Sequence, residues 1–373
     1  MTTASILAAL LALHAPIGLQ DAPGPAADTG VVSFGGHLTW AVGEGPAGRE
    51  HGAFFVDPAR PRAVLLAGSG YEPYGSPLGD AWTFDLATST WSELKLMGAA
   101  LTPGGGRRTA VVRGSGRKPA SVYLHGGYAE GMQEIDTLWR AELRDDAVVL
   151  TELEQVNAPV ARLLHGFAAS PSGDTLVLFG GIGGDDGLAD TWIGRVAGDR
   201  VTWRELVLET NPGKRFGFSF AFDEARGRFL VCSGQVPPKE DEEPRMIVAE
   251  DLWSLDFTAE APKWTCLATY SSAEFHGRRN PAFTFDEASG DLFVWGGTGD
   301  GATALTDLYV VHTRDEGAPV KRLAQPEGVP TRASGFGVVD AARGRALLGF
   351  GNDASGPKLD LIEIRLRGGA GQE

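Results

Sequence analysis

Short apolar runs that end at a glycine recur along the chain. In "LVLFGGIGGDDGLADTW", residues 176–192, an apolar run meets a glycine pair, a polar loop and then Asp-Thr-Trp. Five further copies follow the same order, and the first glycine position falls at Gly68, Gly126, Gly180, Ser233, Gly296 and Gly351. These positions are 53 to 63 residues apart. A sustained period of this size is typical of a repeat architecture.

Each repeat carries the signals of four strands. In "FGFSFAFDEARGRFLVC", residues 216–232, an apolar strand turns back through a tight polar turn into a second strand, as in a hairpin. The third strand opens with an acid and places a large residue two positions on, as in Asp190 and Trp192. The fourth is short and often holds a tryptophan, such as Trp264. Four antiparallel strands per repeat predict one blade of a β-propeller.

The last repeat lacks a fourth strand, and "LTWAVG" at residues 38–43 supplies a strand ahead of the first repeat. An N-terminal strand that completes the last blade would close the ring and protect its edges. We therefore predict an all-β fold: a six-bladed β-propeller of four-stranded antiparallel blades, closed by that strand. The propeller is expected at residues 31–367, with a C-terminal tail at 368–373.

The repeats resemble those of the kelch family, the propeller type also found in the central domain of galactose oxidase. The resemblance rests on the glycine pairs at 126–127, 180–181 and 296–297, on the aromatic residue downstream and on the fourth-strand tryptophan. It implies a binding face made by the loops that open the blades and the loops between second and third strands. The galactose-oxidase copper site is not expected, because Cys266 falls on an outer strand although Tyr270 is close in sequence.

Charge and the N-terminal residues narrow the class of protein. A net charge of −15 with no basic run argues against nucleic-acid binding. Residues 1–20 form an apolar run of signal-peptide length, too short and interrupted to span a bilayer, and residues 21–30 form a Pro/Ala/Gly linker. We expect a secreted or periplasmic monomer with no membrane span.

Cys232 and Cys266 are expected two strands apart in one blade, as two buried free thiols.

An arginine close to the start of every repeat suggests an anion-binding face. The six blade-opening arginines are Arg49, Arg107, Arg162, Arg215, Arg278 and Arg332, and Arg108 and Arg279 add two more cations. Around one channel mouth they would concentrate positive charge, and the planar guanidinium suits carboxylate or sulfate groups. The alternative is structural, with each arginine tying one blade to the next through backbone carbonyls or a carboxylate.

Aromatic, histidine and acidic residues fall on the same predicted face. Tyrosines beside arginines suit sugar or peptide recognition, although packing within the loops explains them slightly better; these are Tyr71, Tyr74 and Tyr128, with Asp300 nearby. Three histidines lie close to the blade openings, at His51, His165 and His276, but no short spacing fixes a metal geometry. No metal or other cofactor is therefore predicted. The acidic loop at 235–250 is interpreted as a solvated tip, with a lid or cation site as alternatives.

These patterns favour a non-catalytic binding module, exported, which recognises an anionic group on a protein or an acidic glycan. Carbohydrate binding and protein binding both stay open. An enzyme is the second interpretation, because some periplasmic kelch propellers that resemble this layout epimerise acidic sugars such as sialic acid. Its acid and base candidates would be His51, His165 and Glu240. A purely structural interaction domain is the third.

Overall fold

The computed structural model describes residues 32–41, 43–70, 75–114, 120–184, 186–238, 246–300, 304–325 and 328–366. In these ranges the chain is all-β, and helix is limited to short 3-10 turns such as Glu130–Met132. None of the described helices is long and apolar enough to cross a membrane. The predicted signal peptide at 1–20, the linker at 21–30 and the tail at 368–373 lie outside the described residues.

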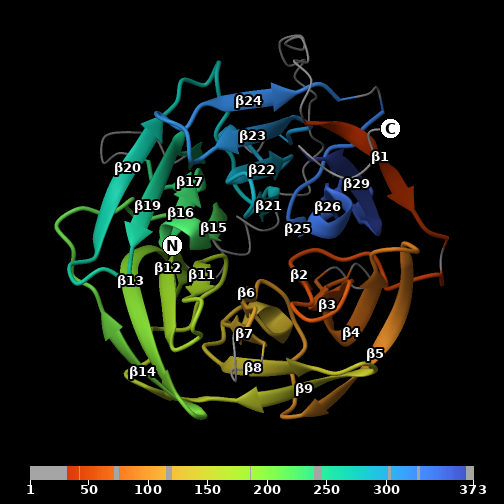
Figure 1. The fold of residues 1–373 in the computed structure, drawn as a ribbon, viewed down its shortest axis with the longest axis horizontal. Helices are drawn as coiled ribbons and strands as arrows, with labels where there is room; N and C mark the ends of the chain where they lie inside the picture. The colour runs from red at the N-terminus through yellow and green to blue at the C-terminus, as the bar shows by residue number, and fades with distance from the viewer. Residues whose placement is uncertain are drawn as a thin grey trace.

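The principal strands of the described chain fall into six groups of four, arranged around a centre (Figure 1). From the centre outward, the first group is β2 (Ala53–Val56), β3 (Arg62–Ser69), β4 (Pro77–Asp85) and β5 (Thr90–Gly98). The second is β6 (Arg108–Val112), β7 (Ser121–His125), β8 (Leu138–Leu143) and β9 (Ala147–Glu152). The third is β11 (Gly166–Ala169), β12 (Thr175–Gly183), β13 (Asp186–Ala197) and β14 (Arg200–Glu205).

The fourth group is β15 (Ser219–Asp223), β16 (Arg228–Cys232), β19 (Asp251–Asp256) and β20 (Lys263–Thr269). The fifth is β21 (Ala282–Asp286), β22 (Asp291–Trp295), β23 (Leu308–His312) and β24 (Val320–Leu323). The sixth is β25 (Phe336–Asp340), β26 (Arg345–Gly349), β29 (Asp360–Arg365) and β1 (Ser33–Thr39). Shorter strands are β10 (Glu154–Val156), β17 (Gln235–Val236), β18 (Ile247–Val248), β27 (Asn352–Asp353) and β28 (Gly356–Pro357).

The first strand of the described chain pairs with the last. β1, red in Figure 1, runs antiparallel to β29, with Ser33 opposite Arg365 and Thr39 opposite Asp360. This strand begins at Ser33 and ends at Thr39, earlier than the predicted segment 38–43, which is a correction to the sequence analysis. Trp40 follows it and packs edge-on against Trp91 of the first group, with ring centroids 5.9 Å apart, while its indole donates to the Ser89 carbonyl. Its role is thus to join two groups, not to continue the strand.

Parallel pairing at the outer rim departs from the predicted set of separate antiparallel blades. β5 runs parallel to β9, from Lys95 opposite Ala147 to Gly98 opposite Leu150. The first two groups therefore form one eight-stranded sheet. β10 likewise runs parallel to β14. These pairings cover strand edges that would otherwise be open to association with other chains.

The glycine motif is read correctly only from the structure. The first position of the motif has φ of 54–65° in all six groups but is not always glycine. It is occupied by Ala67, Gly126, Gly180, Ser233, Gly296 and Phe350. Its second position is glycine in all six groups, at Gly68, Gly127, Gly181, Gly234, Gly297 and Gly351. The sequence alignment, which put Gly68 and Gly351 in the first position, was therefore wrong by one residue.

Close approach to the opening segment of its own group explains why the second position is glycine, and its N–H bonds to the next group. The N–H of Gly127 donates to the carbonyl of Arg162 in the next group at 2.8 Å, and Gly351 donates to the Arg49 carbonyl at 2.8 Å. A Cβ on Gly127 would stand 2.5 Å from the carbonyl oxygen of Gly105, and one on Gly351 would collide with that of Ala333. Backbone meets backbone here, so no side chain fits.

Replacing Gly351 with alanine should therefore destabilise the fold by about 2–5 kcal/mol, through left-handed strain plus the backbone shift that the clash requires. Gly198→Ala is a matched control, because Gly198 has φ of 63° and open space around its Cβ position. That control should cost only the strain, about 1–2 kcal/mol. Urea denaturation of both variants measures the difference, and equal losses would contradict the close-approach explanation.

Apolar clusters fill the space between neighbouring groups. Between the sixth and first groups, Phe336 stacks on Phe350 with centroids 4.6 Å apart, and Phe54 and Trp91 pack against them.

The cysteines lie in the fourth group, on β16 and β20 with β19 between them, and both are free. Cys232 is buried, but Cys266 is exposed, which corrects the prediction that both thiols are buried. An outermost strand leaves one face of its side chains to solvent.

Candidate functional site

Five of the six predicted arginines are buried, at most 2% exposed, and each pairs with the acid that opens a third strand. The pairs are Arg49–Asp80, Arg162–Asp190, Arg215–Asp251, Arg278–Asp307 and Arg332–Asp360. Arg162 shows the full arrangement, with its two terminal nitrogens 2.7 and 2.8 Å from the Asp190 oxygens and a third bond of 3.0 Å to the Gly180 carbonyl.

The acid of each pair is held from two sides. The Trp192 indole donates to Asp190 at 2.7 Å, and Trp82 and Trp253 do the same in their own groups. This bond explains why a large aromatic residue stands two positions after the acid. Burial raises the pKa of Asp190, but hydrogen bonds from Arg162 and Trp192 outweigh it and hold that pKa below its ordinary value. The geometry therefore favours the structural interpretation of these five arginines.

Arg107 does not occupy the position of the other five. In the second group that position belongs to Gly104, whose carbonyl accepts from the second glycine of the preceding group, Gly68, at 2.9 Å. Arg107 lies three residues later and is 3% exposed, with its guanidinium 5.4 Å from the Trp139 ring. It donates to the carbonyls of Gly104 and Thr102. The glycine run Gly104–Gly106 was the signal in the sequence that the register shifts here.

A narrow circle of left-handed residues surrounds the axis. Two positions after each opening residue, φ lies between 48° and 73°, at His51, Gly106, Leu164, Gly217, Asn280 and Ser334. Backbone hydrogen bonds link these residues in series from Gly106 through His51, Ser334, Asn280 and Gly217 to Leu164, such as His51 N–H to the Ser334 carbonyl at 3.1 Å and Gly106 N–H to the His51 carbonyl at 2.9 Å. This circle fixes where the side chain of His51 lies.

A cavity of about 510 Å³ follows the axis, lined by the innermost strands of all six groups. His51, Arg107 and Arg108 line one end of it. Arg108 donates through Nε to the His165 carbonyl at 2.9 Å, and its guanidinium reaches to 5.5 Å from the Phe220 ring. Within the described part of the chain, neither Arg107 nor Arg108 has a carboxylate partner. Burial lowers the pKa of both to about 10.

His51 brings a second polar group to the same end. It is 6% exposed, and its Nε2 has no hydrogen-bond partner among the described residues. Burial, and then the charges of Arg108 and Arg279, lower the pKa of His51 to about 3, so the imidazole is neutral at physiological pH. This end of the cavity thus holds the partly accessible Arg108 cation and, next to it, the neutral and largely buried imidazole of His51.

The other predicted histidines do not converge with His51 on a metal site. His165 Nε2 lies 3.1 Å from Nδ1 of His125 in the neighbouring group, and both side chains are fully buried. His165 thus bonds to the second group and also packs against Phe167 of its own group. The described residues contain no group of three His, Cys, Asp or Glu side chains placed to hold a metal ion.

Loop residues of the predicted face have structural contacts where the structure describes them. Tyr128 is buried, 2% exposed, with its hydroxyl 2.7 Å from Ser69 Oγ. Asp300 accepts from the Val248 N–H at 2.9 Å, and Arg279 donates to Gln235 Oε1 at 2.7 Å, so the bases of two neighbouring loops are joined. Tyr71, Tyr74 and Glu240 lie outside the described residues, as does the centre of the loop at 235–250.

Glu50 is a buried acid that sequence reasoning missed. It directly follows the opening arginine of the first group and is 2% exposed. Its carboxylate accepts from Asn352 Nδ2 of the sixth group at 2.6 Å. Its position next to Arg49 in the sequence was the available signal, but that position holds Leu163, Phe216 or Ala333 in other repeats.

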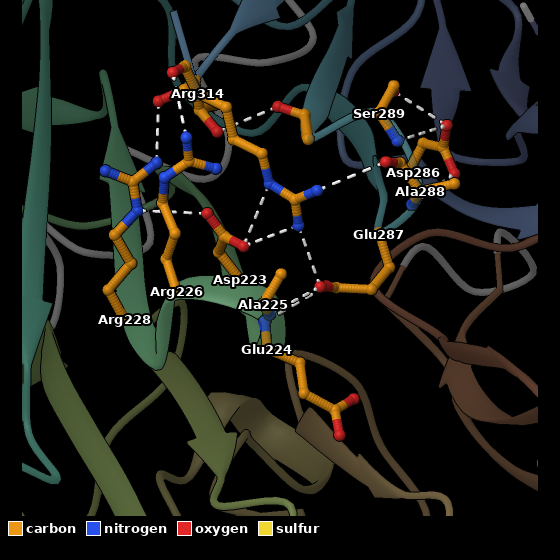
Figure 2. Close-up of polar contacts among 12 residues, drawn as sticks. Asp223, Glu224, Ala225, Arg226, Arg228, Asp286, Glu287, Ala288, Ser289 and Arg314 are labelled. Carbon is orange, nitrogen blue, oxygen red and sulfur yellow. Dashed lines mark hydrogen bonds and ion pairs between the residues drawn. The ribbon is translucent and has the colours of Figure 1, made fainter.

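By contrast, cations and acids pair with each other at the hairpin turns that join the first and second strands of the fourth and fifth groups (Figure 2). Arg314 bridges Asp223 and Glu287, with N–O distances of 2.6 and 2.9 Å. Glu287 also accepts the backbone N–H groups of Glu224 and Ala225, which belong to the neighbouring group. Such a matched network ties two strand groups together, whereas the Arg108 end has a cation without a matching acid.

Comparisons with known proteins agree with the repeat pattern. No family model matches the chain. It is 26% identical over 286 residues to Adagio-like protein 1 and 25% identical over 287 residues to Putative adagio-like protein 2, both from Oryza sativa subsp. japonica. Each alignment covers 73% of this chain and 42% of the relative, so the chain spans less than half the length of these relatives.

A solved structure, titled "Structure of YjhT", superposes with a TM-score of 0.62 and 14% sequence identity. The match covers 86% of this chain and 96% of that chain, and at this identity it shows the fold alone. Together with the all-β arrangement in Figure 1, these likenesses support a kelch-like β-propeller. They contain nothing that specifies the galactose-oxidase type.

Proposed function

We propose that this chain is a six-bladed kelch-like propeller that acts as a non-catalytic binding module and grips an anionic group at the Arg108 end of its axial cavity. Six strand groups, the pairing of β1 with β29 and the bond from Gly351 to Arg49 support six blades in a closed ring. Export, expected from residues 1–20, and a monomeric state belong to the same proposal.

The observation that carries the proposal is a partly accessible cation without a counter-charge. A buried charge is costly unless it is paired, and Arg108 faces the cavity with only its Nε bonded within the described chain. A bound carboxylate or sulfate would supply the missing charge and could accept two parallel bonds from the guanidinium. The proposed site therefore moves from the ring of blade-opening arginines to Arg107, Arg108 and His51.

The epimerase alternative is less favoured by the chemistry of His51. A general base works best when its pKa lies near the working pH, and the pKa of His51 is lowered to about 3. His165 is enclosed against His125, and burial lowers its pKa well below the ordinary value. Both are poor proton acceptors at neutral pH. Recognition of an anion needs no proton transfer and uses these groups as they stand.

The proposal predicts that a small anion raises the melting temperature of the purified chain and that Arg108→Gln abolishes the effect. A ligand at about 100 times its dissociation constant stabilises the folded state by about 2.7 kcal/mol. Thermal-shift measurements should compare 3-phenylpropionate, glucuronate, sialic acid and neutral glucose at matched ionic strength.

Arg204→Gln is the control for net charge, because Arg204 is exposed on β14 far from the innermost strands. That variant should respond to the anion like the unmodified protein. If no anion shifts the melting temperature, or if both arginine variants keep the same shift, the anion site is rejected and a purely structural interaction domain becomes the better interpretation.

A further inference from the structure

Resting on the function proposed above, we propose that the ligand is a small monocarboxylate with an aromatic or branched apolar body. Its carboxylate would contact Arg108 and its body would lie between phenylalanine side chains of the cavity wall. The inference concerns the chemical class of the ligand, and it stands on the phenylalanine lining of the cavity and the placement of Arg108 at one end of it.

Strand alternation produces the apolar wall. In both β15 and β21, the first, third and fifth residues are buried and the two residues between them are partly accessible. The accessible positions are phenylalanines, at Phe220, Phe222, Phe283 and Phe285, and all four line the cavity. Because successive side chains point to opposite sides of a strand, the sequence "FAF" or "FTF" places two rings on the cavity side.

Head and body positions are adjacent. The Arg108 guanidinium lies 5.5 Å from the Phe220 ring, and the Phe220 and Phe283 ring centroids are 5.2 Å apart. A carboxylate bonded to Arg108 would therefore carry its next carbons directly onto aromatic surface. Stacking and edge-on contacts with such rings contribute beyond simple burial.

The size of the cavity and its phenylalanine wall beside Arg108 disfavour a sugar acid. A volume of about 510 Å³ suits a single small molecule, in the range usual for ligand pockets. Each sugar hydroxyl that loses water without gaining a partner costs about 1–3 kcal/mol. The four phenylalanine rings offer no hydrogen bonds, so hydroxyl groups placed against this wall would lose water without gaining a partner.

Isothermal titration calorimetry with three matched probes tests the inference. 3-Phenylpropionate carries both head and body, glucuronate carries the same charge on a polar body, and 3-phenylpropanol keeps the body without the charge. We expect 3-phenylpropionate to bind at least tenfold more tightly than either of the others. Arg108→Gln should weaken it at least tenfold, and Phe283→Ala should weaken it while leaving the small affinity for acetate unchanged.

The outcomes separate the two proposals. Tighter binding of glucuronate than of 3-phenylpropionate, with dependence on Arg108, would overturn the apolar body and leave the anion site standing. Failure of every acid to bind would overturn both. If Phe283→Ala melts at a much lower temperature without ligand, Phe285→Leu provides a milder change of the same wall, and an unchanged affinity in that variant would count against the inference.

Discussion

Asp190→Ala should lower the free energy of unfolding by about 3–5 kcal/mol, because it leaves the fully buried Arg162 guanidinium without its counter-charge. The substitution also removes the acceptor of the Trp192 indole. Breaking one partner of a buried pair costs far more than the pair itself contributes, since the remaining charge is still desolvated. Urea denaturation at neutral pH measures the loss.

The second group supplies a matched control. Asp136 opens its third strand as Asp190 does in the third group, but it is exposed, and the opening arginine is replaced there by Gly104. Asp136→Ala should therefore change stability by less than about 0.5 kcal/mol, as surface substitutions usually do. Similar losses for the two variants would show that the acid stabilises the third strand itself and not the arginine.

The arrangement of strands could be predicted from the sequence because local signals repeat. Hairpin turns, apolar alternation and the Asp-x-Trp spacing each depend only on residues close together in the sequence. Because these patterns recur in several repeats, one repeat that matches them poorly does not obscure the fold. The likeness to kelch repeats follows from the same signals. The parallel pairing of β5 with β9 carries no such signal, since it depends on where two outer strands from different repeats come to lie.

Register within the weak copies could not be predicted, because two adjacent positions both tolerate glycine. Only the clash at the second position separates Gly351 from Phe350, and that clash involves a carbonyl from a residue eighteen positions earlier, Ala333. The three-residue shift at Arg107 has the same origin. A motif defined by close approach of distant backbone segments is visible only once those segments are placed.

The sequence predicted an anion-binding face at the blade-opening arginines, and the structure pairs five of them with aspartates. Whether an arginine is free depends on what faces it, and the aspartates that neutralise five of them lie 28 to 36 positions away in the sequence. One signal was available. Arg108 starts a first strand where the other groups have Ala53, Gly166, Ser219, Ala282 or Phe336. A cation at a position that is uncharged in the other five groups is the kind of departure that a functional site produces.

Acidification from pH 7 to pH 5 should lower the free energy of unfolding by on the order of 5 kcal/mol, because three histidines are buried in the folded protein. Burial, with nearby cations adding to it, lowers the pKa of His51 and His125 to about 3 and that of His165 well below 6.5. The unfolded chain takes up protons on these residues near pH 6.5, while the folded chain does not. Stability is therefore complete above about pH 6.5 and falls as the pH drops toward 3.

Carboxylates act in a lower window and do not obscure this effect. The folded-state pKa values of Asp80, Asp190 and Asp307 are lowered from 3.8, so their contribution is lost only below about pH 4. His125→Phe removes one of the three histidines and should reduce the loss between pH 7 and pH 5 by about one third, although it lowers stability at pH 7 by leaving His165 without its partner. Urea denaturation at pH 7, 6 and 5 measures both slopes. A stability that is flat over this range, or a slope that His125→Phe leaves unchanged, would mean that the buried imidazoles accept protons in the folded state.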